Sequence, residues 1–366
     1  MNNAGNDSSS GRVLSDEEIA TRLTRFSRAA LEQEEVATVN QAASSAASRE
    51  TPGAIAAPPR DDDLFAALTR YEDLPEQWRG KYLWQWDERT RVLPVDIAIS
   101  ALFTIGNRKI ERRAMQRESI TILSREFDMF YTGIELRQDD ELIWMQLLHM
   151  ARGYERPLGS AICFTPSRFL AAIGKNRGSQ NYIHLKESMA RLQATTVELY
   201  SKQHKSTKTF RLVSYFEYQD ERFNTLPAWK VVLDPRIFFM LDGKYHAQMN
   251  FACRKKLGSG LTSKLHSYYA CHKKPMDRSI SDLFSLCYGK DEQIKILFYR
   301  QRRIKRTVAN ESKATTYLSS LKYDFKRYLI EALEMLTSTE VNFLSSYKIY
   351  NDGSVAMVHV DRSAQD

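Results

Sequence analysis

The chain repeats one order of secondary-structure patterns, and this repeat restricts its possible folds more than any other feature. In the first copy, RQDDELIWMQLLHMA carries apolar residues on one helical face, and a strand, AICFT, precedes a short helix, PSRFLAAIG. A polar turn, KNRGSQN, leads to a second helix, YIHLKESMARLQAT, and alternating strands, TTVELYSK and KTFRLVSYFEY, complete the copy. Apolar spacings of three and four residues predict helices, and strict alternation predicts strands.

The second copy follows the same order. A helix is predicted over 257–273, and PMDRSISDLFSLCYG predicts a short extended piece followed by a short helix. A long helix is predicted over 315–338. The chain then forms a predicted hairpin of 341–350 and 354–360, since the Asn-Asp-Gly turn between alternating strands is a strong hairpin signal.

Helix, short helix, turn, longer helix and hairpin together describe a winged helix-turn-helix. We therefore predict an α+β fold with two tandem winged-helix domains, at 94–243 and 244–366. An aromatic connector over 64–93 is expected to dock on a domain or a partner. Residues 1–63 read as a largely disordered tail, because segments such as QAASSAASRETPGAIAAPPR bury too little apolar area to offset the entropy of ordering.

Positive charge is concentrated in the second copy. The whole chain has a formal net charge of +8, but residues 244–328 hold 19 Lys and Arg against 6 Asp and Glu. A basic surface favours nucleic acid or anionic lipid as a partner. No stretch approaches the length of a membrane span and the N-terminus lacks a secretory pattern, so we expect a protein of the bacterial cytoplasm.

The second helix of a helix-turn-helix lies in the major groove, and its first turns meet base edges. Asn and Gln pair with adenine, and Arg and Lys with guanine, although an ordinary solvated helix face carries similar residues. In the first domain the predicted DNA-binding residues are Lys175, Arg177, Ser179, Gln180, Asn181, His184, Lys186 and Arg191.

In the second domain, the segment 293–313 separates the two helices and reads as a basic arm or extended turn. Phe298 and Tyr299 beside its basic run suit a DNA groove better than free solvent. The predicted contacts here are Arg300, Arg302, Arg303, Lys305 and Arg306 in the arm, and Ser319, Lys322, Tyr323, Lys326 and Arg327 on the long helix.

Patterns typical of enzymes are missing, so we expect no catalytic centre, cofactor or metal site. There is no G-x-x-x-x-G-K-[ST] motif, and the four cysteines are scattered. His149-x-x-Arg152 has the spacing found in tyrosine recombinases, but a helix C-terminus with favourable cationic residues explains it better. The acidic cluster Asp139-Asp140-Glu141 is interpreted as a helix start that suits the dipole.

Several separated segments resemble the TrfA-type replication initiators of broad-host-range plasmids. They are SALFTIGNRKIERRAMQ, YTGIELRQDDELIWMQLL, the Phe164-Thr165 pair, RLQAT and the C-terminal hairpin with its VHV ending, all within roughly 94–362. The resemblance implies a protein that binds direct repeats (iterons) of double-stranded DNA, helps to melt an adjacent AT-rich origin segment, and exists as monomer and dimer.

The resemblance also implies partners, namely the host initiator, the helicase and the sliding clamp, and contact with single-stranded origin DNA. In the family a short Gln-Leu-x-Leu-Phe-like motif ahead of the first domain contacts the clamp. Here the matching segments, DDDLF and YLWQW, lack the leading Gln and offer Leu64, Phe65, Leu83 and Trp86.

Two other interpretations remain open from the residues. One is a transcriptional repressor with the same folds, since initiators often repress their own promoter. The other is a DNA strand-transfer enzyme of the tyrosine recombinase type, which a covalent protein–DNA adduct would support.

Overall fold

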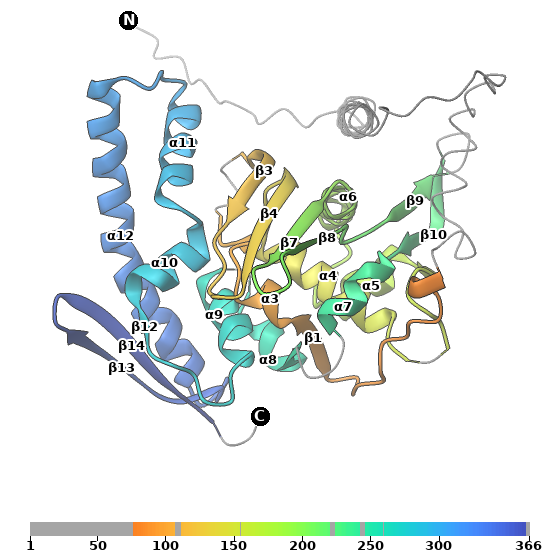
Figure 1. Ribbon diagram of the computed structural model, residues 1–366. Coiled ribbons are helices and arrows are strands. Elements are labelled where there is room, and N and C mark those ends of the chain that lie inside the picture. Colours follow the sequence, from red (N-terminus) through yellow and green to blue (C-terminus); the bar gives the residue numbers. More distant parts are fainter. Residues whose placement is uncertain are drawn as a thin grey trace, which may run out of the picture. The chain divides into compact units, whose positions relative to one another are not determined.

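The computed structural model describes residues 76–363, apart from 107–110, 154, 220–223, 242–245 and 259. These residues form a mixed α+β fold (Figure 1). The predicted tail, the first part of the connector, and Leu64 and Phe65 lie outside the described residues. Within the described part, no helix combines the length and apolar character that a membrane span requires.

Two antiparallel sheets support the first half of the described chain, in the strand orders β3-β4-β7-β8 and β6-β10-β9. Alternate side chains of β7 are buried, because successive residues of a strand point to opposite faces. The strands are β3 Ala114–Ile120, β4 Phe127–Ile134, β6 Ala161–Phe164, β7 Thr196–Ser201, β8 Ser206–Phe210, β9 Tyr215–Gln219 and β10 Thr225–Val232.

The helices of this half lie where the periodicity predicts them: α4 Gln138–Met150, α5 Pro166–Ala172 and α6 Ser179–Gln193. Helix α5 starts with Pro166, whose missing N–H costs nothing in a first turn. Leu185, Met189 and Leu192 form the buried face of α6. The sequence KTFRLVSYFEY is two strands rather than one, because the chain leaves the first sheet after β8 and joins the second at β9.

The second half contains α9 Leu261–Ala270, α10 Ile280–Tyr288, α11 Asp291–Arg302 and α12 Val308–Thr337. The predicted basic arm is therefore mainly a helix, α11, which lies beside α12 (Figure 1). Helix α12 also begins earlier than its periodicity suggests. At its start, the Thr307 hydroxyl accepts a hydrogen bond from the Asn310 backbone N–H and so caps the helix.

The C-terminal hairpin consists of β13 Leu344–Asp352 and β14 Val355–Arg362, with β12 Arg278–Ser279 paired on its other side. Asp352 pairs with Val355, so the two-residue turn is Gly353-Ser354 and not the predicted Asn-Asp-Gly segment. Gly353 has a φ of +60°, a backbone conformation that glycine adopts at no steric cost.

Short elements complete the fold. They are a 3-10 turn at Glu76–Trp78, β1 Thr90–Pro94, α3 Val95–Ala98, β2 Phe103–Thr104, β5 Leu136–Arg137, a 3-10 turn at Pro235–Ile237, α7 Phe238–Leu241, β11 His246–Asn250 and α8 Phe251–Lys256.

Two large clusters of buried apolar side chains form the interior. The first extends from Leu83 to Phe251 and includes Trp144, Leu185 and Val231. The second contains Ile99 and residues from Leu257 to Val360. Strand β1 pairs with β11 across the predicted boundary at 243/244, and Met249 of β11 belongs to the first cluster. The exact domain limits stay a prediction.

The connector packs against the end of α4. The Trp86 indole N–H donates a hydrogen bond to His149 Nδ1 at 3.1 Å, and the Arg152 guanidinium donates to the Trp86 carbonyl at 3.0 Å. His149 Nε2 lies 3.0 Å from the Glu88 carboxylate. The His149-x-x-Arg152 pair therefore holds the connector in place, which agrees with its interpretation as a helix C-terminus.

Candidate nucleic-acid-binding surface

The turn between α5 and α6 presents polar and basic side chains to solvent. Asn176 shapes it, because its side-chain oxygen accepts a hydrogen bond from the Gly178 N–H at 3.2 Å and its carbonyl oxygen accepts one from the Asn181 amide at 3.1 Å. Of the predicted contacts, Arg177, Ser179, Gln180 and His184 are exposed and Lys175 and Asn181 are half-buried. These six side chains therefore lie together at the turn and the first turns of α6.

Arg191 does not belong to this surface. Its guanidinium bonds to the Asp140 carboxylate at 2.9 Å, and only 14% of its side chain is exposed. Asp140 is fully buried and also accepts from Arg112 at 2.6 Å. A buried carboxylate needs such partners, so the prediction that Arg191 meets DNA is wrong. Helical spacing alone does not reveal a buried carboxylate contributed by α4.

Lys186 lies at the edge of the same helix. Its ammonium group is 4.5 Å from the centre of the Tyr218 ring, a cation–π contact with β9. Lys186 is half-buried, and it can reach a ligand only by leaving this ring.

The hairpin of β7 and β8 follows α6 directly, and its turn is exposed and basic. Lys202, His204 and Lys205 lie there, and Lys205 has a φ of +49°. Lys202 pairs with Asp128 at 2.9 Å, whereas no ion pair to Lys205 is present in the described part of the chain. These residues are not among the predicted contacts, although the alternating strands on both sides of the QHK turn indicate a hairpin there.

A second basic surface lies where α11 turns into α12. Arg300, Arg302, Arg303, Lys305 and Arg306 are all exposed. Arg306 pairs with Glu292 at 2.8 Å, while the other four form no ion pair with any described residue. Arg303 has a φ of +51° and ends α11, so the run lies at the tip of a helical hairpin rather than along an extended arm.

Phe298 and Tyr299 are not available to a DNA groove. They are 4% and 7% exposed and pack with Ala314 in a small cluster between α11 and α12. Aromatic side chains beside a basic run are equally suited to holding two helices together. The aromatic part of the arm prediction is therefore wrong.

On α12 the predicted contacts Ser319, Tyr323, Lys326 and Arg327 are exposed, and Tyr323 has 83% of its surface free. Lys322 is half-buried and bonds to Asp291 at 2.6 Å. Arg327 lies 3.8 Å from Asp324 one turn earlier. On this face of α12, Lys326 is the cationic side chain that forms no ion pair with another described residue.

Leu83 and Trp86, the described part of the predicted clamp contact, are buried in the first apolar cluster, at 0% and 6% exposed. The expectation that they lie free for a partner is therefore wrong. Their apolar character arises because the connector docks on the protein itself.

The acidic cluster at the start of α4 serves internal ion pairs. Asp139 accepts two hydrogen bonds from Arg112, each of 3.0 Å, and Asp140 and Glu141 are fully buried. No group of three potential metal-ligating side chains is found among the described residues.

A comparison with protein families matches the TrfA protein family over residues 80–310. A curated relative from Escherichia coli, "Plasmid replication initiator protein TrfA", is 29% identical over 211 residues, which are 57% of this chain and 54% of the relative. The chain thus spans about half the length of that relative.

Two solved structures are similar at low identity. Domains 2 and 3 of RctB match 75% of this chain and 99% of that chain, with 14% identity and a TM-score of 0.46. The Pi initiator protein in complex with iteron DNA matches 62% of this chain and 92% of that chain, with 15% identity and a TM-score of 0.38. The family match covers more than half of the chain, including both sheets and the α5–α6 turn, and the chain therefore belongs to the TrfA family.

Proposed function

We propose that this protein is a plasmid replication initiator that binds iteron repeats through two winged-helix units. The observation that best supports this proposal is that a helix, a second helix and a hairpin follow one another twice in a member of the TrfA family. In each copy, exposed cations lie just ahead of the second helix: Arg177 before α6, and the basic run from Arg300 to Arg306 before α12. The curated relative, named a plasmid replication initiator protein, supports the same proposal.

In the first unit, α5 and α6 form the helix-turn-helix, and β7 with β8 forms the wing. Helix α6 is the recognition helix, and Arg177, Gln180, Asn181 and His184 meet base edges near its start. The Lys205 turn of the wing contacts the adjacent phosphates. This division follows the general pattern in which base contacts specify and phosphate contacts position.

In the second unit, α10 and α12 form the helix-turn-helix and the C-terminal hairpin forms the wing. Helix α11 is inserted between them and extends the unit with a basic tip. Tyr323 and Lys326 of α12 face the groove. Arg300, Arg302, Arg303 and Lys305 neutralise phosphates, a contribution to affinity that depends on salt through counterion release.

The proposed role includes steps after binding. The protein helps to melt the origin, holds single-stranded origin DNA, and recruits the host initiator, helicase and sliding clamp in the bacterial cytoplasm. It interconverts between monomer and dimer, and it has no catalytic activity of its own.

The test is a salt-titrated binding assay on duplex DNA from the plasmid origin, with a scrambled duplex of equal length as reference. We expect origin-selective binding and a steep fall in affinity with salt. Equal, weak binding to both duplexes would contradict the proposal. An origin-opening assay with host proteins then separates an initiator from a winged-helix repressor, because a repressor binds without opening the duplex.

A further inference from the structure

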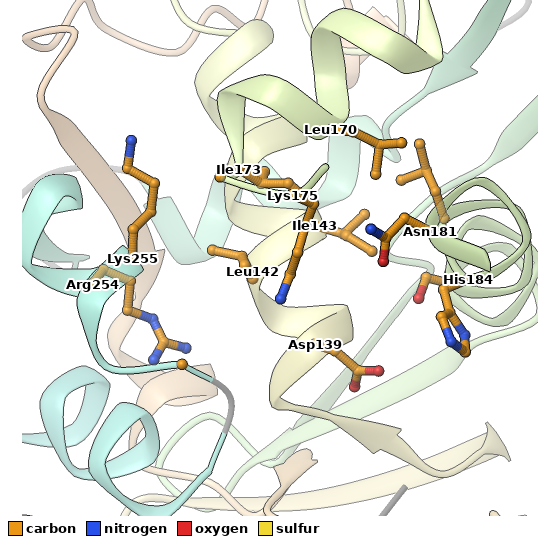
Figure 2. Close-up of a pocket in the computed structure, with 14 residues that line it drawn as sticks. Asp139, Leu142, Ile143, Leu170, Ile173, Lys175, Asn181, His184, Arg254 and Lys255 are labelled. Atoms are coloured by element: carbon orange, nitrogen blue, oxygen red, sulfur yellow. The ribbon is translucent and has the colours of Figure 1, made fainter. Parts of the chain in front are cut away.

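A cavity lies beneath the α5–α6 turn, between α4, α6 and α8 (Figure 2). Its apolar wall includes Leu142, Ile143 and Leu170. Three cationic side chains line it: Lys175 from the turn, and Arg254 and Lys255 from α8. A cavity with one apolar wall and cationic residues in its lining is suited to a small ligand that carries both an apolar part and an anion.

Arg254 provides the strongest indication of a ligand. It is 2% exposed, and its Nη2 donates to Glu141 at 2.9 Å and to Gln138 at 3.0 Å. Its Nε and Nη1 have no hydrogen-bond partner among the described residues, although both are buried. Buried donors without partners are costly, so an acceptor that reaches them from the cavity would be stabilised.

The two lysines add further positive charge beside these unpaired donors. Among the described residues, neither Lys175 nor Lys255 forms an ion pair. The Lys255 ammonium group lies 5.1 Å from the centre of the Phe251 ring and points away from Arg254 and Lys175 (Figure 2), so Lys255 reaches an anion in the cavity only by leaving this ring. Asp139 is the one carboxylate among the described residues that line the cavity, and Arg112 donates two hydrogen bonds to it. Glu141 balances the charge of Arg254, so the excess positive charge at the cavity comes from the two lysines, which would attract an anion.

We propose that this cavity binds a small phosphate-bearing molecule, with the phosphate between Lys175, Lys255 and the unpaired donors of Arg254. The apolar part of the ligand rests on Leu142 and Leu170. A DNA phosphate fits less well, since the duplex backbone cannot approach a guanidinium that is almost entirely enclosed. Because Asn181 and His184 line the same cavity, the bound ligand touches the helix that is proposed to read DNA.

The experiment uses the full chain without DNA and phenyl phosphate as the probe, with phenol as its uncharged counterpart. Isothermal titration at constant ionic strength is expected to show saturable binding of phenyl phosphate, and binding of phenol that is weaker by roughly tenfold or more. Lys175→Gln and Lys255→Gln should each weaken phenyl phosphate by about tenfold. Arg177→Gln is the matched control, because Arg177 belongs to the same turn but does not line the cavity.

Urea unfolding of each variant shows whether the fold is retained, and neither lysine is part of a buried ion pair. Absence of binding up to about 10 mM probe would overturn the proposal. An equal loss of phenyl phosphate affinity in Arg177→Gln would also overturn the proposal, because it would mean that the general positive charge of the surface binds the probe. If Lys175→Gln weakens only duplex binding while phenyl phosphate fails to bind, the cavity face belongs to the DNA surface. Since DNA is absent from the titration, its outcome is independent of the initiator proposal.

Discussion

The Arg254 guanidinium of α8 lies 2.9 Å from the Glu141 carboxylate of α4, and both side chains are enclosed, at 1% and 0% exposed. Ser267 of α9 donates to the same carboxylate at 2.6 Å, and Gln138 donates to its other oxygen at 2.9 Å. One buried carboxylate therefore joins a helix of the first apolar cluster to two helices of the following segment.

Glu141→Gln is expected to destabilise the protein by about 3–5 kcal/mol, because it leaves the Arg254 charge buried without a counter-charge. Urea unfolding measures the change. The double variant Glu141→Gln/Arg254→Met should recover much of the loss, since it removes both charges. If the loss of unfolding free energy in the double variant equals the sum of the losses in the two single variants, the ion pair makes no specific contribution to stability.

Arg191→Met is expected to reduce stability and leave the salt dependence of DNA binding unchanged, because Arg191 bonds to buried Asp140. Arg177→Ala should do the opposite: it should keep the stability and weaken binding to the origin duplex, because its exposed guanidinium is proposed to meet a base edge. Arg89→Ala, which removes an exposed cation of the connector, is the control for net charge. A changed slope in Arg191→Met would contradict the assignment.

Double substitution of Arg302 and Arg303 by Ala is expected to weaken binding to origin and scrambled duplexes alike and to lower the salt slope by about two units. These side chains lie at the exposed tip between α11 and α12, where phosphates rather than bases are the expected contact. A loss confined to the origin duplex would instead place the tip against base edges.

Acid should loosen the connector through His149. Burial, and next the positive charge of Arg91, lower the pKa of His149 to about 4. Trp86 and Arg91 both donate to its Nδ1, so the neutral ring with its proton on Nε2 is the form that fits. A histidine whose pKa is lower in the folded state adds stability that is complete above its unfolded pKa of about 6.5 and is lost as pH falls toward 4.

From this shift we expect a loss of about 2 kcal/mol between about pH 7 and about pH 5. Urea unfolding followed by tryptophan fluorescence measures it. His149→Gln should flatten this dependence, because the amide can accept from Trp86 and donate to Glu88 without titrating. An unchanged pH profile in that variant would mean that His149 does not cause the loss.

Gly174→Ala should destabilise by about 1–2 kcal/mol. Gly174 follows the last turn of α5 and has a φ of +72°. A methyl group added there would lie 3.2 Å from the Lys255 side chain. Gly353→Ala is the control, because Gly353 shares the positive φ (+60°) but has no atom within 4 Å of such a methyl group. Equal losses would show that backbone strain alone accounts for the effect.

The periodic parts of the chain were predictable from sequence. Helices α5, α6 and α12 and the final hairpin follow from apolar spacing, because one buried face sets that spacing. Helix α4 is buried on nearly all sides, and its apolar residues were sufficient to locate it. Helix α11 was missed since its basic residues dominate the pattern, whereas Ile294, Phe298 and Tyr299 mark a narrow buried face.

The exposed part of the first surface was also predictable, from the position of Arg177, Gln180 and His184 in and after a polar turn. The burial of Arg191 was not, because its partner Asp140 is distant in sequence and becomes its neighbour only when α4 packs against α6. The prediction that Leu83 and Trp86 contact a partner was wrong for the same reason. An apolar motif does not reveal whether it covers its own domain or a partner.

The pairing of β1 with β11 places residues 90–94 beside residues 246–250, so both ends of the first half of the fold share one two-stranded ribbon. A fragment cut at residue 244 would carry β11 with an unpaired edge, and such edges pair with whatever strand they meet. The C-terminal half therefore cannot be exchanged between proteins as an independent unit. Recombination that moves this half to another protein must also supply a strand in place of β1. We therefore expect the two halves to be inherited together.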